Sequence, residues 1–349
     1  MRKYKVIIYG SYGYTGELIA EECLTENISV LLSGRNEVRL KTQSEKTGYP
    51  YKAVDINDPT ALLNLLKDGD VLINAAGPFI NTASLTVEAC IDTKTHYLDI
   101  NGDVKVFELI RSYSEKANDA GIMLMPGVGF DVVPTDCMAL KLKNRMPDAI
   151  ELKLAFATIG GGISHGTATT VAGRLGEPAV RRENGELIPV PLGKNGMWVD
   201  FGEKRMFVMS IPWGDVSTAF VTTGIPNIES FMAVKPKIYR LLKFQGLVNW
   251  LLRTEFIRSM VLKKIDSRPA GPTLEERKRS HALIWGEAKN KDGKTITASM
   301  RTPESYTLTA ISTVHIAKKV LNVEFKKGYQ TPAGVYGESL VEEVGGVVL

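Results

Sequence analysis

Three glycines with a regular spacing come directly after the first apolar run of the chain. Gly10, Gly13 and Gly16 follow the predicted strand Val6–Tyr9, and a helix is predicted over Gly13–Leu24. A glycine loop between a strand and a helix offers backbone N–H groups and the positive end of the helix dipole, and both attract a pyrophosphate. We therefore predict a dinucleotide site formed by Gly10, Ser11, Tyr12, Gly13, Tyr14, Thr15 and Gly16.

The end of the second predicted strand, Ser29–Ser33, indicates which dinucleotide binds. NAD enzymes usually place Asp or Glu at this point to bind the ribose 2′-hydroxyl, whereas an arginine suits the 2′-phosphate of NADP. This chain has Arg35 there, with Ser33 and Asn36 as additional donors. A guanidinium can bind a phosphate through two parallel hydrogen bonds. We predict NADP as the cofactor; the alternative for Arg35 is a solvated side chain that begins the next helix.

Two further loops complete the predicted cofactor path. Asp55 ends the third predicted strand, where its carboxylate could bind the adenine amino group or cap a backbone N–H. The fourth strand ends at Asn74, and the small residues after it allow the backbone to lie against the nicotinamide ribose. The residues predicted to line this loop are Ala75, Ala76, Gly77 and Pro78.

Three side chains are candidates for proton transfer, which a hydride transfer to a polar double bond requires. Tyr97 belongs to the fifth predicted strand, and Asp131 lies in a glycine-rich loop that we expect to cross between two domains. His165 lies in the glycine-rich segment 160–170, and its unperturbed pKa near ~6.5 suits proton transfer. The alternatives are a capping role for Asp131 and, for His165, substrate contact or an ordinary loop hydrogen bond.

Composition excludes several other classes of function. The 4 histidines and 3 cysteines form neither an HxxxH nor a CxxC pattern, so we predict no metal site and no disulfide framework. A net charge of +4 on 349 residues is too small to indicate nucleic-acid binding. We find no signal-peptide pattern and no run of about 18 apolar residues. We therefore expect a cytoplasmic protein.

The elements that position these residues follow from hydrophobic periodicity. Short apolar runs alternate with helical segments over the first third of the chain, which is typical of βαβ units on a parallel sheet. The predicted strands are Val6–Tyr9, Ser29–Ser33, Tyr51–Asp55, Val71–Asn74, His96–Asp99 and Ile122–Met125, and a single helix is predicted over Val106–Ala120. Six such strands indicate an α/β protein with an N-terminal Rossmann domain over residues 1–135.

A second domain of α+β class is predicted over residues 136–303. Its expected strands include Leu152–Thr158, Met206–Ile211, Ala219–Thr223, and a hairpin of Ala282–Ala288 with Ile296–Arg301. We expect an antiparallel or mixed sheet that supplies the substrate site. Helices predicted at Tyr306–Leu321 and Ala333–Glu343 place residues 304–349 back on the Rossmann domain.

Segment 235–265 is both basic and apolar. It carries eight basic residues against the single acidic residue Glu255, with apolar side chains between them. Helices of this composition can lie in a membrane interface. The alternatives are a helical lid or a homodimer contact with a solvated basic face.

The motifs together resemble the saccharopine dehydrogenase-like family, which includes trans-acting enoyl reductases. The matching segments are Tyr9–Gly16, Ser33–Asn36, Asn74–Phe79, His96–Asp103 and Pro126–Asp136. The resemblance implies an NADP(H)-dependent oxidoreductase that reduces a C=N, C=O or activated C=C bond of a small-molecule or lipid-like substrate. Two alternatives stay open: a trans-acting enoyl reductase on a lipid-like or carrier-bound acyl group, and a non-catalytic, membrane-associated NADP-binding protein.

Overall fold

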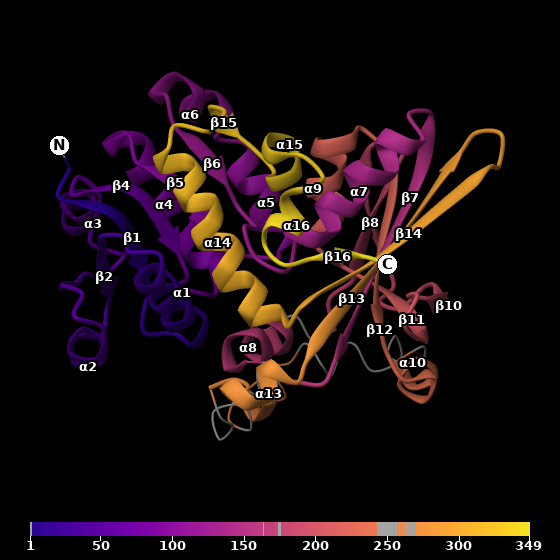
Figure 1. Cartoon of the computed structure of the whole chain (residues 1–349), viewed down its shortest axis with the longest axis horizontal. Coiled ribbons are helices and arrows are strands. Elements are labelled where there is room, and N and C mark those ends of the chain that lie inside the picture. Colours follow the sequence, from indigo (N-terminus) through magenta and orange to yellow (C-terminus); the bar gives the residue numbers. More distant parts are fainter. Residues whose placement is uncertain are drawn as a thin grey trace. The chain divides into compact units, whose positions relative to one another are not determined.

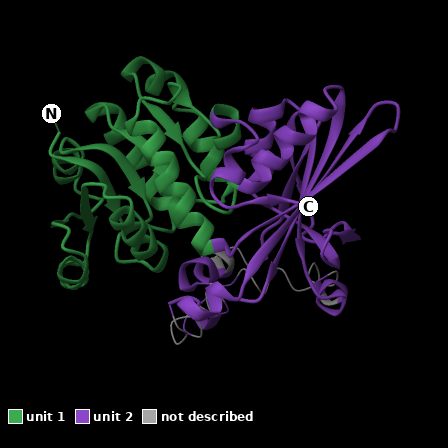
Figure 2. Cartoon of the chain, viewed as in Figure 1, with its two compact units in different colours: residues 1–133, 306–335 green, residues 134–305, 336–349 purple. Residues whose placement is uncertain are grey.

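The computed structural model describes residues 2–162, 164–173, 176–242, 254, 257, 259–261, 263 and 270–349. The chain forms two compact units, residues 1–133 with 306–335 and residues 134–305 with 336–349 (Figure 2). Each unit therefore combines two separate stretches of the sequence. The predicted domain boundary at 135 lies close to the point where the first unit ends.

The first unit contains a parallel sheet in the order β15-β6-β5-β4-β1-β2-β3 (Figure 1). Its strands are β1 (Tyr4–Tyr9), β2 (Val30–Gly34), β3 (Tyr51–Ala53), β4 (Gly69–Asn74), β5 (His96–Asp99), β6 (Met123–Met125) and β15 (Gly328–Tyr329). The strand order reverses between β1 and β4, which is where Rossmann sheets bind their ligands. The predicted α/β fold with a Rossmann sheet is confirmed, and β15 is an additional edge strand that the six predicted strands did not include.

Three helices of this unit begin after a residue whose side chain caps them. The helices are α1 (Tyr14–Thr25), α2 (Glu37–Thr47), α3 (Pro59–Leu66), α4 (Phe79–Thr93), α5 (Val104–Arg111), α6 (Ser114–Ala120), α14 (Ser305–Leu321) and α15 (Pro332–Tyr336). Asn36, Asp58 and Asp103 each accept a hydrogen bond from a backbone N–H of the helix that follows them. The single helix predicted over Val106–Ala120 is interrupted, because α5 ends at Arg111 and α6 begins at Ser114.

Packing on the sheet follows the alternation of strand side chains. Ile7, Leu72 and Tyr97 belong to the same buried cluster as Leu62 of α3 and Val87 of α4. The intervening strand residues are also buried, so the sheet is covered on both faces, as parallel sheets require. The loops that follow the carboxyl ends of the strands lie at the edge of this buried core.

Those carboxyl ends are in register across the centre of the sheet. Tyr9 pairs with Ser33 of β2 on one side and with Asn74 of β4 on the other, and Asn74 pairs with Asp99 of β5. Polar residues that are far apart in the sequence therefore lie in one row, directly below the loops predicted to bind the cofactor.

The second unit is built on a mixed sheet. Among the described residues the order is β10-β11-β12-β7-β13-β14-β16, and β8 pairs with β12 and β9. The strands are β7 (Ala149–Ile159), β8 (Ala179–Glu183), β9 (Glu186–Val190), β10 (Gly196–Asp200), β11 (Arg205–Ile211), β12 (Asn227–Ala233), β13 (His281–Asn290), β14 (Thr295–Pro303) and β16 (Val347–Val348). Its helices are α7 (Val133–Arg145), α8 (His165–Gly173), α9 (Asp215–Thr223), α10 (Pro236–Leu242), α13 (Leu274–Lys278) and α16 (Leu340–Glu343). Only β7 and β12 run parallel within the central strands, and the predicted β13–β14 hairpin is present.

Two predictions for the later part of the chain are wrong. The expected strand Ala219–Thr223 lies in helix α9, because Val216, Ala219 and Thr223 have helical spacing and are buried together on one face. The expected helix Ala333–Glu343 is two short helices, and residues 336–349 belong to the second unit. Their place there follows from β16, which pairs with β14.

Candidate functional site

The glycine loop after β1 fits tightly against the loop after β4. Gly10 has a φ of +81°, and a Cβ atom on it would lie 2.8 Å from the backbone nitrogen of Ala76. A Cβ atom on Gly16 would overlap the carbonyl oxygen of Gly10 and lie 2.8 Å from that of Ser11. Gly13 precedes α1 and has no side chain to cap it. The cradle that a dinucleotide requires is therefore formed by backbone alone, which is why glycine is needed at these positions.

Ser11 and Tyr12 have structural roles within the cradle. The Ser11 hydroxyl donates to Oε1 of Gln43 at 2.8 Å, and Nε2 of Gln43 donates to the Ser11 carbonyl at 2.8 Å. The Tyr12 ring covers Gly34, where a Cβ atom would lie 2.6 Å from Cε1 of the ring. The predicted loop residues thus hold the cradle onto α2 and β2, while Tyr14 lies edge-on to Tyr306 of α14 with ring centroids 5.1 Å apart.

The side chains predicted to bind the adenosine end of the cofactor differ in the hydrogen bonds that they already make within the protein. The Ser33 hydroxyl donates to the carbonyl of Lys52 at 2.8 Å, and Asn36 caps α2. The exposed Asp55 carboxylate accepts from both the backbone and the side chain of Asn57, at 2.9 and 3.0 Å, in a local turn. Arg35 is exposed at the end of β2. Of these four residues, Arg35 is the one whose side chain carries the positive charge that a 2′-phosphate needs.

A buried polar network lies beneath the loop at 75–78. The Asn74 amide donates to the Tyr97 hydroxyl at 3.4 Å, and its Oδ1 atom accepts from the N–H of Ala76 at 3.1 Å. The Tyr97 hydroxyl donates to Oδ2 of Asp99 at 2.7 Å. Burial raises the pKa of Tyr97 well above its ordinary value. Tyr97 is completely buried, so its hydroxyl does not reach a substrate; it positions the loop instead.

Asp99 also fixes the loop that carries Asp131. Its Oδ1 atom accepts from the N–H of Gly127 at 2.9 Å. From the other side, Thr309 of α14 accepts from the N–H of Phe130 at 3.0 Å, and Ser312 donates to the carbonyl of Val128 at 2.7 Å. Sequence reasoning missed Thr309 and Ser312, because nothing local distinguishes them from other helical hydroxyl residues.

Asp131 has the electrostatic character of an acid–base group. Burial raises its pKa to about 7. Its carboxylate lies against Gly102, where a Cβ atom would come within 2.5 Å of Oδ2. A carboxyl group near half-protonation at neutral pH can donate or accept a proton. Of the three candidates for proton transfer, Asp131 is therefore the one that the first unit favours.

The third candidate, His165, belongs to the second unit. It begins α8, and its backbone N–H donates to the carbonyl of Ala270 at 2.8 Å. Ser164 caps this helix by accepting from the N–H of Thr167 at 3.2 Å. Ile163 lies outside the described residues, as does most of segment 235–265.

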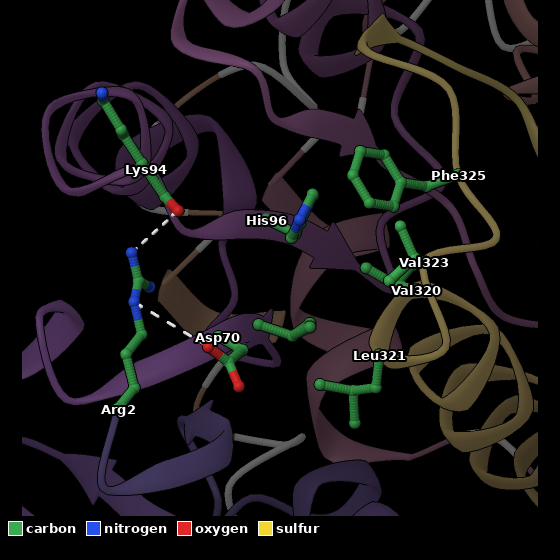
Figure 3. A pocket seen from close by; sticks show the side chains of 9 residues that line it. Arg2, Asp70, Lys94, His96, Val320, Leu321, Val323 and Phe325 are labelled. Atoms are coloured by element: carbon green, nitrogen blue, oxygen red, sulfur yellow. Dashed lines mark hydrogen bonds and ion pairs between the residues drawn. The ribbon is translucent and has the colours of Figure 1, made fainter.

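A separate cavity of about 350 Å³ lies at the opposite, amino ends of β4 and β5. Figure 3 shows Arg2 and Asp70 on one side of it and Phe325 on the other, with His96 between them. The Arg2 guanidinium donates to the carbonyls of Thr93 and Lys94 at 2.5 and 2.8 Å. Burial lowers the pKa of His96 to about 4, and its Nδ1 atom accepts from the N–H of Met123 at 3.1 Å. These contacts hold Arg2 against the sheet, at the edge opposite to the loops predicted to bind the cofactor.

Two kinds of site are absent from the part of the chain that the structure describes. No group of three His, Cys, Asp or Glu side chains is placed to hold a metal ion. No helix in the described ranges is long and apolar enough to cross a bilayer.

Comparison with known proteins confirms the family resemblance. Residues 6–125 match the model of the saccharopine dehydrogenase NADP binding domain. The saccharopine dehydrogenase-like oxidoreductase of Bos taurus is 26% identical over 219 residues, which cover 55% of this chain and 51% of that protein. The chain thus spans about half the length of the curated relatives it matches. The match to the family model also confirms NADP(H) as the cofactor of this domain.

The fold of the whole chain has a solved counterpart. Apo saccharopine dehydrogenase (L-Glu forming) from Saccharomyces cerevisiae superimposes with a TM-score of 0.69 over 99% of this chain and 100% of that chain. Sequence identity is 13%, so this likeness concerns the fold alone.

The predicted cytoplasmic location is wrong as a general statement. A Caenorhabditis elegans relative, 28% identical over 39% of this chain and 35% of its own length, is named a lipid droplet localized protein. An Arabidopsis thaliana relative, 30% identical over 38% of this chain and 33% of its own length, is named a probable mitochondrial oxidoreductase. These names contradict a location inferred only from the lack of a targeting pattern.

Proposed function

We propose that this chain, whose residues 6–125 form a saccharopine dehydrogenase NADP binding domain, is an NADP(H)-dependent reductase of a C=N, C=O or activated C=C bond. One observation carries the proposal: the glycine cradle and the titratable Asp131 lie in loops at the same carboxyl edge of one parallel sheet. Cofactor and acid–base group therefore share the end of the sheet where Rossmann enzymes perform their chemistry.

Each loop of this edge has a defined part in the proposed mechanism. The backbone of residues 10–16 and the N-terminus of α1 would hold the pyrophosphate of NADPH, and the loop at 75–78 would lie against its nicotinamide ribose. Bound NADPH would supply the hydride. Asp131 gives a proton to the substrate atom on which negative charge develops, and Asp99 keeps the Asp131 loop in place through Gly127.

The direct test is a fluorescence titration of the chain with NADPH, followed by a turnover screen. We expect binding in the micromolar range and oxidation of NADPH with one of three substrate classes: imines, carbonyl compounds or enoyl thioesters. Absence of NADPH binding would contradict the proposal. Binding without turnover in any class would favour the non-catalytic alternative.

A second candidate function, reduction of a lipid-like substrate at a membrane surface, is favoured by an aromatic–basic patch on the second unit. Trp198 is 54% exposed, and its ring centroid lies 5.6 Å from that of Phe207. Tyr239 of α10 packs on Phe207 at 4.9 Å, and the Arg205 guanidinium lies 5.8 Å from the Trp198 ring. Exposed residues close to Tyr239 in the sequence are Lys235, Lys237, Ile238 and Arg240.

This combination suits the headgroup region of a bilayer, where tryptophan and basic side chains are both stabilised. Liposome flotation tests it, with vesicles of neutral lipid and vesicles that contain anionic lipid. We expect flotation only with anionic vesicles, and weaker flotation of Trp198→Ser than of the control Trp285→Phe, which alters a buried residue of the same unit. Equal recovery on both vesicle types would refute this candidate.

A further inference from the structure

The end of β2 contains fewer ligand-ready donors than its sequence suggests. The Ser33 hydroxyl donates to the Lys52 carbonyl and Oδ1 of Asn36 caps α2, so Arg35 is the one cation of the original set. A single arginine would neutralise only part of a dianionic 2′-phosphate, and Glu37 adds a negative charge to the first turn of α2. A second cation at this point would offset the remaining negative charge.

Arg39 is held in position to be that cation. Its guanidinium lies 4.7 Å from the centroid of the Tyr12 ring, and its Nη2 atom donates to the Tyr12 carbonyl at 2.7 Å. Its backbone N–H donates to Oδ1 of Asn36 at 3.0 Å. A guanidinium has five N–H donors, so most of them are left for a ligand after this single side-chain contact. Stacking on the ring reduces the entropy lost when the side chain binds a phosphate.

Tyr12 links this arginine to the cofactor cradle. Its hydroxyl accepts from the N–H of Asn36 at 3.2 Å, and its ring lies directly on Gly34. One side chain of the glycine loop thus touches both the strand end that carries Arg35 and the helix that carries Arg39. A bulkier residue at 34 would displace the ring and with it the support for Arg39.

Two acidic residues of α1 lie near Arg39. Glu17 and Glu21 of α1 line a cavity of about 200 Å³ together with Arg39, Tyr12 and Lys46. Lys46 pairs with Glu21 at 2.6 Å, and burial raises the pKa of Glu17. Arg39 itself forms no ion pair with any residue that the structure describes. Its charge acts on Glu17, whose pKa it lowers against the larger effect of burial.

We propose that Arg39 binds the 2′-phosphate together with Arg35 and is a determinant of the preference for NADP(H) over NAD(H). The inference rests on the proposed NADP(H) dependence and adds a specific residue to it. Arg35 approaches from the end of β2 and Arg39 from the first turn of α2, and Tyr12 sets the position of the second arginine.

The test measures dissociation constants of NADPH and NADH by fluorescence titration of the full chain. Arg39→Met keeps an unbranched side chain on the Tyr12 ring and removes the charge; Lys41→Met, on an exposed residue of the same helix, is the matched control. We expect Arg39→Met to weaken NADPH binding about tenfold or more and NADH binding less than twofold, because NADH lacks the phosphate that the guanidinium would bind; tenfold corresponds to about 1.4 kcal/mol. The NADPH dissociation constant of Arg39→Lys should fall between those of the parent chain and Arg39→Met. The dissociation constants of Lys41→Met should match those of the parent chain.

The outcomes separate this inference from the proposed function. If the parent chain binds neither dinucleotide, the proposed function itself fails. If the parent prefers NADPH and Arg39→Met keeps the same ratio of the NADPH and NADH dissociation constants, Arg39 does not bind the 2′-phosphate. An equal loss for NADPH and NADH would overturn the inference as well, because it would indicate that Arg39 merely supports the loop. Thermal unfolding of each variant identifies any misfolded protein. If Arg39→Met is misfolded, the ratio of the NADPH and NADH dissociation constants of Arg39→Lys tests the inference instead.

Discussion

Replacement of Asp131 by Asn should stabilise the protein above neutral pH while it removes activity. Burial raises the pKa of this carboxyl from its ordinary 3.8 to about 7. An Asp whose folded pKa is raised favours folding most below its unfolded pKa, and that contribution is lost as pH rises from about 4 to about 7. A shift of about three units corresponds to about 4 kcal/mol as an upper bound. Because Asp131 keeps some solvent exposure, we expect a gain of about 1–3 kcal/mol.

Urea denaturation at pH 4.5 and pH 8.5 measures this effect. Asp131→Asn should unfold at higher urea than the parent at pH 8.5, and the difference should shrink at pH 4.5, where both carry a neutral side chain. Asp92→Asn, on an exposed residue of α4, should show no such pH dependence. The turnover number should fall by about 10²–10⁴, with NADPH affinity unchanged.

Two results would refute this reasoning. A stability gain of the same size at both pH values would mean that Asp131 is not held in a desolvated site. Full activity of Asp131→Asn would mean that another group supplies the proton.

Three further substitutions test the framework of the site. Gly10→Ala combines a positive φ with overlap against Ala76, so NADPH binding should be lost. Its unfolding free energy should fall by more than the ~1 kcal/mol expected for Gly48→Ala, because Gly48 has a similar φ but open space around it. Equal losses of unfolding free energy in urea denaturation would contradict the close approach of the two loops. Gly102→Ala places a Cβ atom against the Asp131 carboxylate and should shift the pH profile of the turnover number; an unshifted profile would exclude contact between the two residues. His96 has a depressed pKa of about 4, so its contribution to stability is complete above about pH 6.5 and is lost as pH falls towards 4, by at most about 3 kcal/mol. His96→Gln should lessen this acid-induced loss in a urea series from pH 7 to pH 4, and an identical loss in both proteins would assign it to other groups.

Local patterns were sufficient for most of the first unit. Glycine spacing, strand-length apolar runs and capping residues act over a few neighbours, so the Rossmann sheet and its cofactor class could be predicted from them. The same reasoning failed at Ala219–Thr223, because a short apolar run has the same composition in a strand and in a helix. It also missed β15, whose two residues pair with β6 from a distant part of the chain.

The sequence by itself indicated a dinucleotide site after β1, and residues 6–125 match the model of the saccharopine dehydrogenase NADP binding domain. Only the tertiary structure decided what the polar side chains around that loop do. Tyr97 is buried under the loop at 75–78, the loop that carries Asp131 is held by Asp99 and α14, and the Arg39 guanidinium lies over the Tyr12 ring. These roles depend on burial and on contacts between distant segments, which set pKa values and access to a ligand, and neither quantity is encoded in the spacing of residues along the chain.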